Sequence, residues 1–249
     1  LFADPPPVPF IGRKSKGLTP NFGRPDFNNA GRLARTMPPD RQRAIRDRAK
    51  LAGTTESAMV MAAYADTLTN LGEVDEVILC VPLSRRHSRS LDIYANLVVT
   101  DVPVRVRPID FQSIEALAAE ISRQVQVASE YAPLSDALWT GELRDSLIAQ
   151  GSYTQLYVAG ELTSRRWTQN SISGAFQRPD AQGEIEIGPA KITILPGLRE
   201  GRLNFAEMDF RSLSSVDGLA IIMKYDTVGF THVEAQRFLD EVVYRLEAE

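Results

Sequence analysis

Apolar residues follow two different periods along this chain, and each period predicts a different kind of element. Continuous apolar runs of about four to eight residues, bounded by turn residues, are typical of buried strands. The run from Val77 to Val81, which Pro82 closes, fits this description, and a second strand is expected from Asn96 to Arg105. An arginine-rich loop joins the two strands. The pattern therefore predicts a strand–loop–strand frame on which a site could be built.

Helical spacing of apolar residues predicts helices at 38–52, 56–71, 113–128, 135–150 and from 231 onward. Proline suits the first turn of the first helix, and Gly53 is expected to end it. Thr54 or Thr55 caps the second helix, which is apolar around most of its circumference, should be buried, and is expected to end at Gly72. Thr231 caps the last helix. The expected buried face of that helix consists of Phe230, Val233, Phe238, Leu239, Val242, Val243 and Leu246.

Further strands are expected at 31–36, 153–159, 185–195, 202–213 and 219–225, with a bulge near Ala206–Glu207 and a turn at 214–218. Residues 161–184 have no consistent period and are rich in small polar residues. A loop of that length inside a compact domain is usually functional. Together these elements predict the α/β class, with a mixed β-sheet and packed helices.

Composition limits the classes of protein to consider. The chain has 249 residues, of which 43% are hydrophobic and 24% charged, as is ordinary for a soluble globular protein of one large or two small domains. A net charge of −4 argues against general binding to nucleic acid or anionic membranes, and no apolar run reaches the roughly 18 residues of a transmembrane helix. The single cysteine, Cys80, excludes an internal disulfide and indicates a reducing, cytoplasmic compartment.

Residues 1–30 are expected to form an extended proline-rich linker, and residues 31–249 one folded unit. The chain opens LFADPPPVPF, without an initiator Met and without the features of a signal peptide. Closely spaced prolines favour an extended segment. We therefore interpret the sequence as a piece of a longer polypeptide.

Residues able to carry catalysis are scarce. Neither His87 nor His232 has a neighbouring Cys or His, so no zinc or iron site is expected. No G-x-S-x-G, P-loop or G-x-G-x-x-G motif occurs, which removes support for a standard hydrolase or nucleotide site. The one dense charged feature is the loop RRHSR from Arg85 to Arg89. It is either a capture site for phosphate or an acidic partner, because arginine donates in a fork, or a solvated turn paired with surface acids.

The run from Arg85 to Val106, RRHSRSLDIYANLVVTDVPVRV, resembles without a gap the pattern GRPHPELEGLVGxFVNTLPLRV. That pattern is common in the C-terminal lobe of condensation domains from nonribosomal peptide synthetases, members of the chloramphenicol-acetyltransferase-like superfamily. Matching positions include Arg86, Leu91, Val99, Pro103, Arg105 and Val106. Thr100-Asp101 stands in place of Asn-Thr at the centre. Further segments match in the right order, up to the closing MDFRSLSSVDGLAIIMKYDTVGFTHVEAQRFLDEVVYRLE, so the resemblance covers nearly the whole chain.

The resemblance implies a chloramphenicol-acetyltransferase-like half-domain. In the family, two similar lobes form a V, and a tunnel between them admits two carrier-protein thioesters. The catalytic H-H-x-x-x-D-G motif lies in the N-terminal lobe and is absent here, so no catalytic residue is expected in this chain and the chain alone should be inert. The implied partners are the N-terminal lobe and acyl or peptidyl carrier proteins. Carriers deliver substrates on phosphopantetheine, with no cofactor or metal bound directly and no nucleic acid or membrane partner.

Two groups of contact residues are expected. The tunnel candidates follow from the resemblance and are Thr100, Asp101 and Gln155. The candidates for contact with a carrier or its phosphopantetheine follow from the arginine density of the basic loop and are Arg85, Arg86 and Arg89. Because side chains alternate along a strand, Thr100 and Asp101 should point to opposite faces, so at most one lines the tunnel. The stretch 161–184, or the bend in the strand beyond it, is the candidate bridge to the other lobe.

We therefore expect the C-terminal lobe of a condensation-type acyltransferase of nonribosomal peptide or hybrid polyketide biosynthesis, a route to secondary metabolites such as antibiotics. Its reaction would join a carrier-bound acyl thioester to a carrier-bound amine or hydroxyl. Whether the chain is part of an active enzyme depends on an N-terminal lobe that carries the catalytic His. Two alternatives stay open: a noncatalytic condensation-like module that recruits a carrier protein or tailoring enzyme, and a stand-alone acyltransferase with a soluble acyl donor.

Overall fold

The computed structural model describes residues 30–84, 99–131, 157–161, 183–187, 189–194, 208–215, 218–227 and 230–248. Its elements, in chain order, are β1 (Ala30–Met37), α1 (Pro39–Leu51), α2 (Glu56–Gly72), β2 (Val77–Ser84), β3 (Val99–Val106), a 3-10 turn η1 (Pro108–Asp110), α4 (Ile114–Tyr131), β4 (Tyr157–Glu161), β5 (Gly183–Ile187), β6 (Ala190–Ile194), β7 (Met208–Ser215), β8 (Gly218–Asp226) and α9 (His232–Glu247). Four predicted features lie outside the described residues: the linker, the helix at 135–150, most of the loop at 161–184 and the bulge near Ala206.

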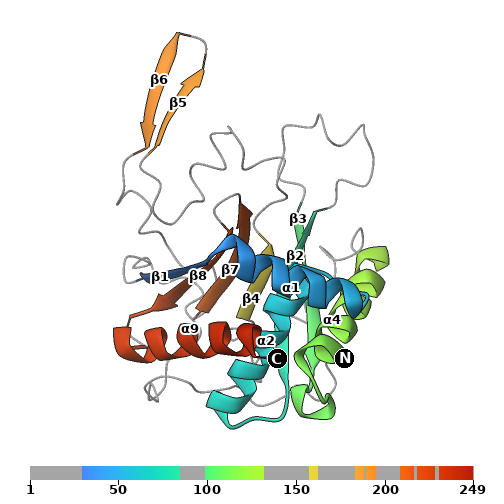
Figure 1. The fold of residues 1–249 in the computed structure, drawn as a ribbon. Helices are drawn as coiled ribbons and strands as arrows, with labels where there is room; N and C mark the ends of the chain where they lie inside the picture. Colours follow the sequence, from blue (N-terminus) through green and yellow to red (C-terminus); the bar gives the residue numbers. More distant parts are fainter. Residues whose placement is uncertain are drawn as a thin grey trace.

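Six of the described strands form one mixed sheet in the order β1-β8-β7-β4-β2-β3. Strands β2, β4 and β7 run parallel, whereas β1, β8 and β3 pair antiparallel with their neighbours. The helices α1, α2, α4 and α9 lie in front of this sheet in Figure 1, as one layer over one face. The prediction of a mixed sheet with packed helices is confirmed. β5 and β6 form a separate antiparallel hairpin that projects away from the sheet.

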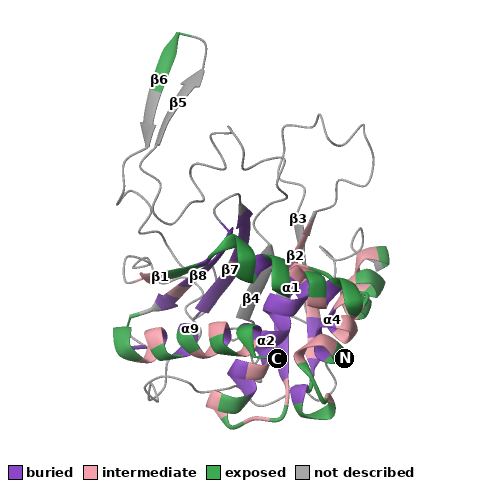
Figure 2. Cartoon of the chain, viewed as in Figure 1, coloured by how far each residue is buried: buried purple, intermediate pink, exposed green. Residues whose placement is uncertain are grey.

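The core fills the space between the sheet and the helix layer, and α2 lies at its centre. The middle of this helix is buried nearly all round (Figure 2), as its apolar sequence predicts. Tyr64 of α2 stacks on Phe210 of β7, with ring centroids 4.3 Å apart, and meets Phe238 of α9 edge-on at 5.7 Å. Both arrangements suit the charge distribution of aromatic rings. One side chain thus joins the sheet to two helices.

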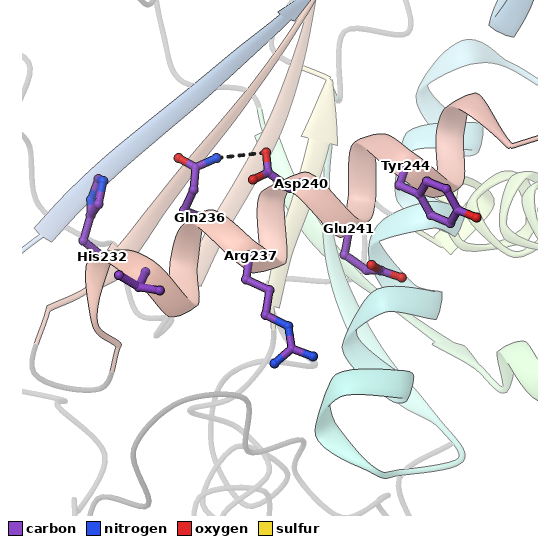
Figure 3. Close-up of a pocket in the computed structure, with 7 residues that line it drawn as sticks. His232, Gln236, Arg237, Asp240, Glu241 and Tyr244 are labelled. Atoms are coloured by element: carbon purple, nitrogen blue, oxygen red, sulfur yellow. Dashed lines mark hydrogen bonds between the residues drawn. The ribbon is translucent and has the colours of Figure 1, made fainter.

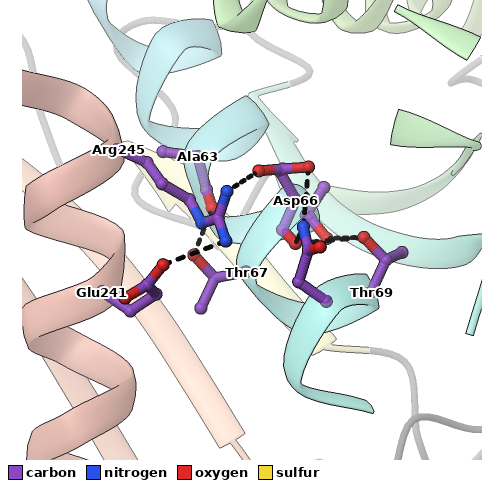
Figure 4. Close-up of polar contacts among 8 residues, drawn as sticks. Ala63, Asp66, Thr67, Thr69, Glu241 and Arg245 are labelled. Carbon is purple, nitrogen blue, oxygen red and sulfur yellow. Dashed lines mark hydrogen bonds and ion pairs between the residues drawn. The ribbon is translucent and has the colours of Figure 1, made fainter. Parts of the chain in front are cut away.

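Polar groups on α2 are paired inside the helix layer (Figure 4). The Thr67 hydroxyl donates to the Ala63 carbonyl at 2.8 Å, which satisfies a polar group in the buried helix. Asp66 forms an ion pair with Arg245 of α9, which also contacts Glu241 at 3.0 Å. These charged contacts fix α9 against α2.

Helix ends are set by local chemistry, mostly as expected. Thr55, rather than Thr54, is the N-cap of α2 and accepts a hydrogen bond from the Ala58 N–H at 3.1 Å. Gly53 follows α1 with a left-handed φ of 66°, as the prediction requires. Gly72, however, belongs to α2, and Glu73 takes the left-handed C-cap conformation with φ 52°. Thr231 forms a complete capping box with Glu234 at the start of α9.

Pro82 does not close β2, which continues to Ser84. β2 pairs with β4 only at Leu79 and Cys80, so beyond Cys80 its one described neighbour is β3. A strand with one free side tolerates a residue that lacks an N–H. β3 begins at Val99 within the described residues, is an edge strand in the described sheet, and accommodates Pro103 for the same reason.

Three other expectations change. The single strand at 185–195 is wrong, because β5 and β6 pair antiparallel at Ile187 and Ala190, with Pro189 in a turn between them. Val233 is 76% exposed, whereas Ala235 takes the buried place. Ala235, Phe238, Leu239, Val242 and Leu246 follow helical spacing, and Val233 lies about 200° from Ala235 around the helix. α4 extends to Tyr131, about one turn beyond the prediction.

Candidate functional site

The parallel strands place their carboxyl ends at one edge of the sheet, where β2 ends at Ser84, β4 at Glu161 and β7 at Ser215. In open α/β sheets, ligands bind in the crevice outside these ends. The first turn of α2 also lies at this edge, because Glu56 and the end of β7 share polar partners. A ligand site is therefore expected at this edge of the sheet.

A groove of about 540 Å³ lies there, and we call it the β2 groove. It is walled by the end of β2, the first turns of α2 with the preceding loop, and the middle of α4. Its described lining residues are Gly53, Thr54, Thr55, Ser57, Ala58, Met61, Val81, Pro82, Leu83, Ile121, Ser122, Val125 and Gln126. Sites for small molecules usually measure about 300–1,000 Å³, so the groove has the size of a ligand site.

The lining of the β2 groove is apolar at depth and hydroxyl-bearing at one side. Met61, Val81 and Ile121 are buried and form the apolar part. The Thr54 hydroxyl donates to the Ala118 carbonyl at 3.1 Å and lies 2.6 Å from Ser122 Oγ. The Thr55 hydroxyl is engaged as the cap of α2. The protein itself thus satisfies both threonine hydroxyls.

A buried polar network joins α1, α2 and the carboxyl end of β7. The Gln42 amide donates to Ser214 Oγ at 2.8 Å and to Glu56 Oε1 at 2.9 Å. Arg46 donates to the same two partners. The network fixes the start of α2, which is one wall of the β2 groove. We did not predict Gln42 as a buried residue, although its position three residues before Ile45 and seven before Ala49 puts it on the buried face of α1.

A charged row crosses the other face of the sheet. Asp209 of β7 is 3% exposed and forms a bidentate pair with Arg211 at 2.7 and 2.6 Å. The register places Lys224 of β8 opposite Asp209, and Arg32 of β1 opposite Lys224. Burial lowers the pKa of Lys224, against the attraction of Asp209. This row lies near the amino end of β7, at the opposite end of the strand from the β2 groove.

A second hollow, of about 560 Å³, runs along the outer face of α9 (Figure 3). Its described lining residues all come from this one helix: His232, Val233, Gln236, Arg237, Asp240, Glu241 and Tyr244. Gln236 donates to Asp240 at 2.9 Å, and His232 Nδ1 lies 3.1 Å from the Tyr225 hydroxyl. Burial opposes ionisation of Asp240, but hydrogen bonds from Arg35 and Gln236 outweigh it and lower the pKa of the carboxyl. A hollow with one wall is a weaker candidate than the β2 groove.

Two of the six predicted site residues, Thr100 and Asp101, belong to β3, which pairs with the strand that lines the β2 groove. Thr100 pairs with Leu83, and Asp101 pairs with Pro82, in the register of β2 and β3. Leu83 and Pro82 line the groove, so the register places both candidates beside it. Arg85, Arg86, Arg89 and Gln155 lie outside the described residues, although Ser84, directly before the basic loop, ends β2 at this edge. The roles of all six stay predictions.

Two properties relate to metals and membranes. No group of three or more His, Cys, Asp or Glu side chains suited to a metal ion occurs among the described residues. Within the same part of the chain, none of the helices combines the length and hydropathy that a membrane-spanning segment needs.

No protein-family model and no curated protein matches the sequence. Solved structures do match the fold. The X-domain from teicoplanin biosynthesis superposes with a TM-score of 0.74 at 15% identity, over 98% of this chain and 51% of that one. The condensation domain from the Monacolin K polyketide synthase MokA gives 0.63 at 15% identity, over 99% and 53%. The four-domain nonribosomal peptide synthetase AB3403 gives 0.70 at 12% identity, over 99% and 18%.

Identities this low establish the fold alone. The chain spans about half the length of the X-domain and of the condensation domain, and a smaller part of the multidomain synthetase. The match extends over nearly every residue of this chain, so the likeness concerns the whole of it. The chain therefore has the chloramphenicol-acetyltransferase-like fold of nonribosomal peptide synthetase condensation domains and covers about half the length of such a domain.

Proposed function

We propose that the chain is the C-terminal lobe of a condensation-type acyltransferase in nonribosomal peptide or hybrid polyketide biosynthesis. The observation that carries the proposal is the match of nearly the whole chain to about half of a condensation domain. The closing sequence motif, which ends at α9, supports the assignment to the C-terminal half. The other half would supply the catalytic His of the H-H-x-x-x-D-G motif.

The proposed reaction is acyl transfer between two carrier-bound substrates. The amine of one substrate attacks the thioester carbonyl of the other, the C–N bond forms, and the C–S bond breaks to release the carrier thiol. A hydroxyl nucleophile would give an ester by the same route. Positioning supplies much of the rate when both reactants are tethered. The role of this lobe is therefore to form a wall that orients substrate.

The proposed wall is the edge of the sheet that holds the β2 groove. The register beside Leu83 and Pro82 supports one of Thr100 and Asp101 as a tunnel residue, because it places this part of β3 next to a cavity of ligand size and successive side chains point to opposite faces. Gln155 is proposed for the tunnel on the sequence resemblance. Arg85, Arg86 and Arg89 are proposed for contact with a carrier or phosphopantetheine because of the arginine density of the loop. The multidomain synthetase among the similar structures supports carrier partners. The cytoplasmic location inferred from Cys80 stays a prediction.

The test is reconstitution with carrier-bound substrates. The 249-residue chain alone, and a protein with both lobes, are mixed with an acyl-loaded donor carrier and an aminoacyl-loaded acceptor carrier. We expect the condensed product, detected by mass spectrometry of the acceptor carrier, from the two-lobed protein only. Turnover by the single chain would overturn the half-domain proposal. A two-lobed protein that binds carriers but forms no product supports the noncatalytic recruiting module instead.

A further inference from the structure

We propose that the β2 groove binds an uncharged, mainly aliphatic ligand. The inference deepens the proposed function and rests on it for the role of the ligand, which would be the apolar part of a carrier-bound substrate. The binding itself rests on the shape and chemistry of the groove.

The shape indicates a site that exists before the ligand arrives. The groove is bounded by three elements, and α2 packs closely against α4 along one side of it. Its α2 wall is held at the start by the bonds from Gln42 and Arg46 to Glu56. The Thr54 contacts with Ala118 and Ser122 fix the loop before α2 to α4. A wall fixed on both sides need not reorganise on binding, which favours affinity.

Burial divides the groove into a floor and a rim. Met61 is 8% exposed, Val81 2% and Ile121 0%, so the floor is apolar. Gln126 is exposed, and Ser57 is half-buried at the start of α2. A ligand with an aliphatic body and a neutral polar end would therefore place the body on the floor and the polar end at the rim.

Charge decides between classes of ligand. Of the described residues that line the groove, none carries an ionisable side chain. A charged group that enters such a site loses its hydration without an opposite charge to replace it. The start of α2 offers the positive end of a helix dipole, but Glu56 already places a carboxylate in that first turn. The described lining of the groove therefore favours a neutral ligand over an anion or a cation of the same length.

Methionine methyl groups can report ligand binding to the groove by NMR. The chain has five, Met37, Met59, Met61, Met208 and Met223, and of these Met61 alone is a described lining residue of the groove. The full chain, labelled with ¹³C at the methionine methyls, is titrated with 1-octanol, octanoate and octylammonium. We expect 1-octanol to shift the Met61 signal in a saturable way, with the other four as internal controls. Both charged probes should bind at least about tenfold more weakly, which corresponds to about 1.4 kcal/mol.

Equal affinity for the charged probes would overturn the inference, and so would shifts spread over all five methionines or absent from Met61. Val125→Asp puts a charge in the groove and should reduce octanol binding at least tenfold. Val127→Asp is the matched control, because Val127 is 45% exposed on the same helix and is not among the lining residues. If Val125→Asp fails to fold, Ser57→Trp fills the rim from a half-buried position and should also remove binding.

The titration contains no carrier and no second lobe, so its result is independent of the reconstitution test. If octanol binds but the two-lobed protein forms no condensed product, the proposed function is rejected and the groove remains a site for an aliphatic ligand. Condensation without octanol binding would keep the function and reject the groove as the aliphatic site.

Discussion

Gln42 of α1 donates a hydrogen bond to Ser214 of β7 across 2.8 Å, although 172 residues separate the two in the sequence. Gln42 is 2% and Ser214 6% exposed, so water does not replace this bond when it is lost. The same amide donates to Glu56, which stands at the start of α2. Gln42 therefore holds the helix layer to the carboxyl end of the sheet together with Arg46, which donates to the same two partners.

Gln42→Leu is expected to lower the free energy of unfolding by about 1–3 kcal/mol, because Ser214 and Glu56 each lose a buried donor. Urea denaturation measures the change. Arg43→Ala is the matched control, since Arg43 is exposed on the same helix, and it should change stability by less than about 0.5 kcal/mol. A Gln42 variant as stable as the control would show that the Gln42 bonds contribute nothing to folding beyond those of Arg46.

Asp209→Asn is expected to cost more, about 3–5 kcal/mol, because it leaves Arg211 and Lys224 without their buried opposite charge. Asp209 is 3% exposed, and the amide keeps its size. The comparison is Glu247→Gln, which removes an exposed pair with Arg41 at 3.9 Å and should cost no more than about 1 kcal/mol. Equal losses in the two variants, measured by chemical denaturation, would contradict the importance assigned to burial.

Local sequence patterns were sufficient to predict those elements whose buried residues follow a simple pattern along the chain. The apolar circumference of α2 predicted its central place, and Thr231 with Glu234 three residues later is the signature of the capping box that forms. The continuous apolar run from Leu219 to Met223 marks β8, which begins one residue before its predicted start and ends one residue after its predicted end. Such features depend on neighbours within a few positions, which the sequence displays directly.

Relationships between distant segments were not predictable in this way. The role of Gln42 on the buried face of α1 could not be predicted, because its partner Ser214 is distant in the sequence. Asp209 is buried, yet its sequence neighbours do not predict a charged row across three strands. The β2 groove needs β2, α2 and α4 together, and no one of them carries a motif for it. The order of the strands, with β4 between β7 and β2, is equally nonlocal.

Acid should weaken the fold partly through Glu76. Hydrogen bonds from Arg105 at 2.9 and 2.7 Å hold the pKa of this carboxyl below its usual value of 4.5, against the opposing effect of burial. A lowered folded-state pKa gives stability that is fully present above the unfolded-state pKa and is lost as pH falls through the folded-state pKa.

Glu76→Gln should therefore be less stable than the natural chain at pH 7, by up to about 1 kcal/mol for a partly exposed pair. The difference should shrink as pH falls below about 4.5, the usual value, and vanish below the lowered one. Thermal unfolding of both proteins between pH 3 and pH 7 measures it. A difference that does not change with pH would mean that Glu76 acts through packing rather than charge. Glu130→Gln, on exposed α4 surface, is the control.

Two glycines with positive φ provide a test of close backbone contact. Gly218 has φ 118°, and a Cβ there would lie 1.9 Å from the Met37 carbonyl oxygen. Gly53 has φ 66° with nothing within 4 Å of the same position. Gly53→Ala should cost about 1–2 kcal/mol from backbone conformation alone. Gly218→Ala should cost more than about 3 kcal/mol, because strand β1 must move as well. Similar losses in urea denaturation would show that β1 yields easily there.

Arg85→Ala with Arg89→Ala is expected to weaken carrier binding at low salt, if the basic loop contacts an acidic carrier surface or phosphopantetheine. Exposed ion pairs contribute about 0.2–1 kcal/mol each, so the double variant should lose roughly two- to thirtyfold in affinity. Fluorescence anisotropy of a labelled holo-carrier protein measures it. The loss should fade as salt rises, because the screening length falls from about 30 Å at 0.01 M to about 8 Å at 0.15 M.

The matched control for the basic loop is Arg43→Ala with Arg237→Ala, which removes two exposed cations from α1 and α9 and the same total charge. Arg86 stays unchanged in both variants, because its alternative role is an ion pair with a surface acid. If the loop is a specific contact, the control keeps the affinity of the natural chain at every salt concentration. Equal losses in the two double variants would instead trace binding to net charge alone. Unchanged affinity in both would remove the loop from the carrier surface.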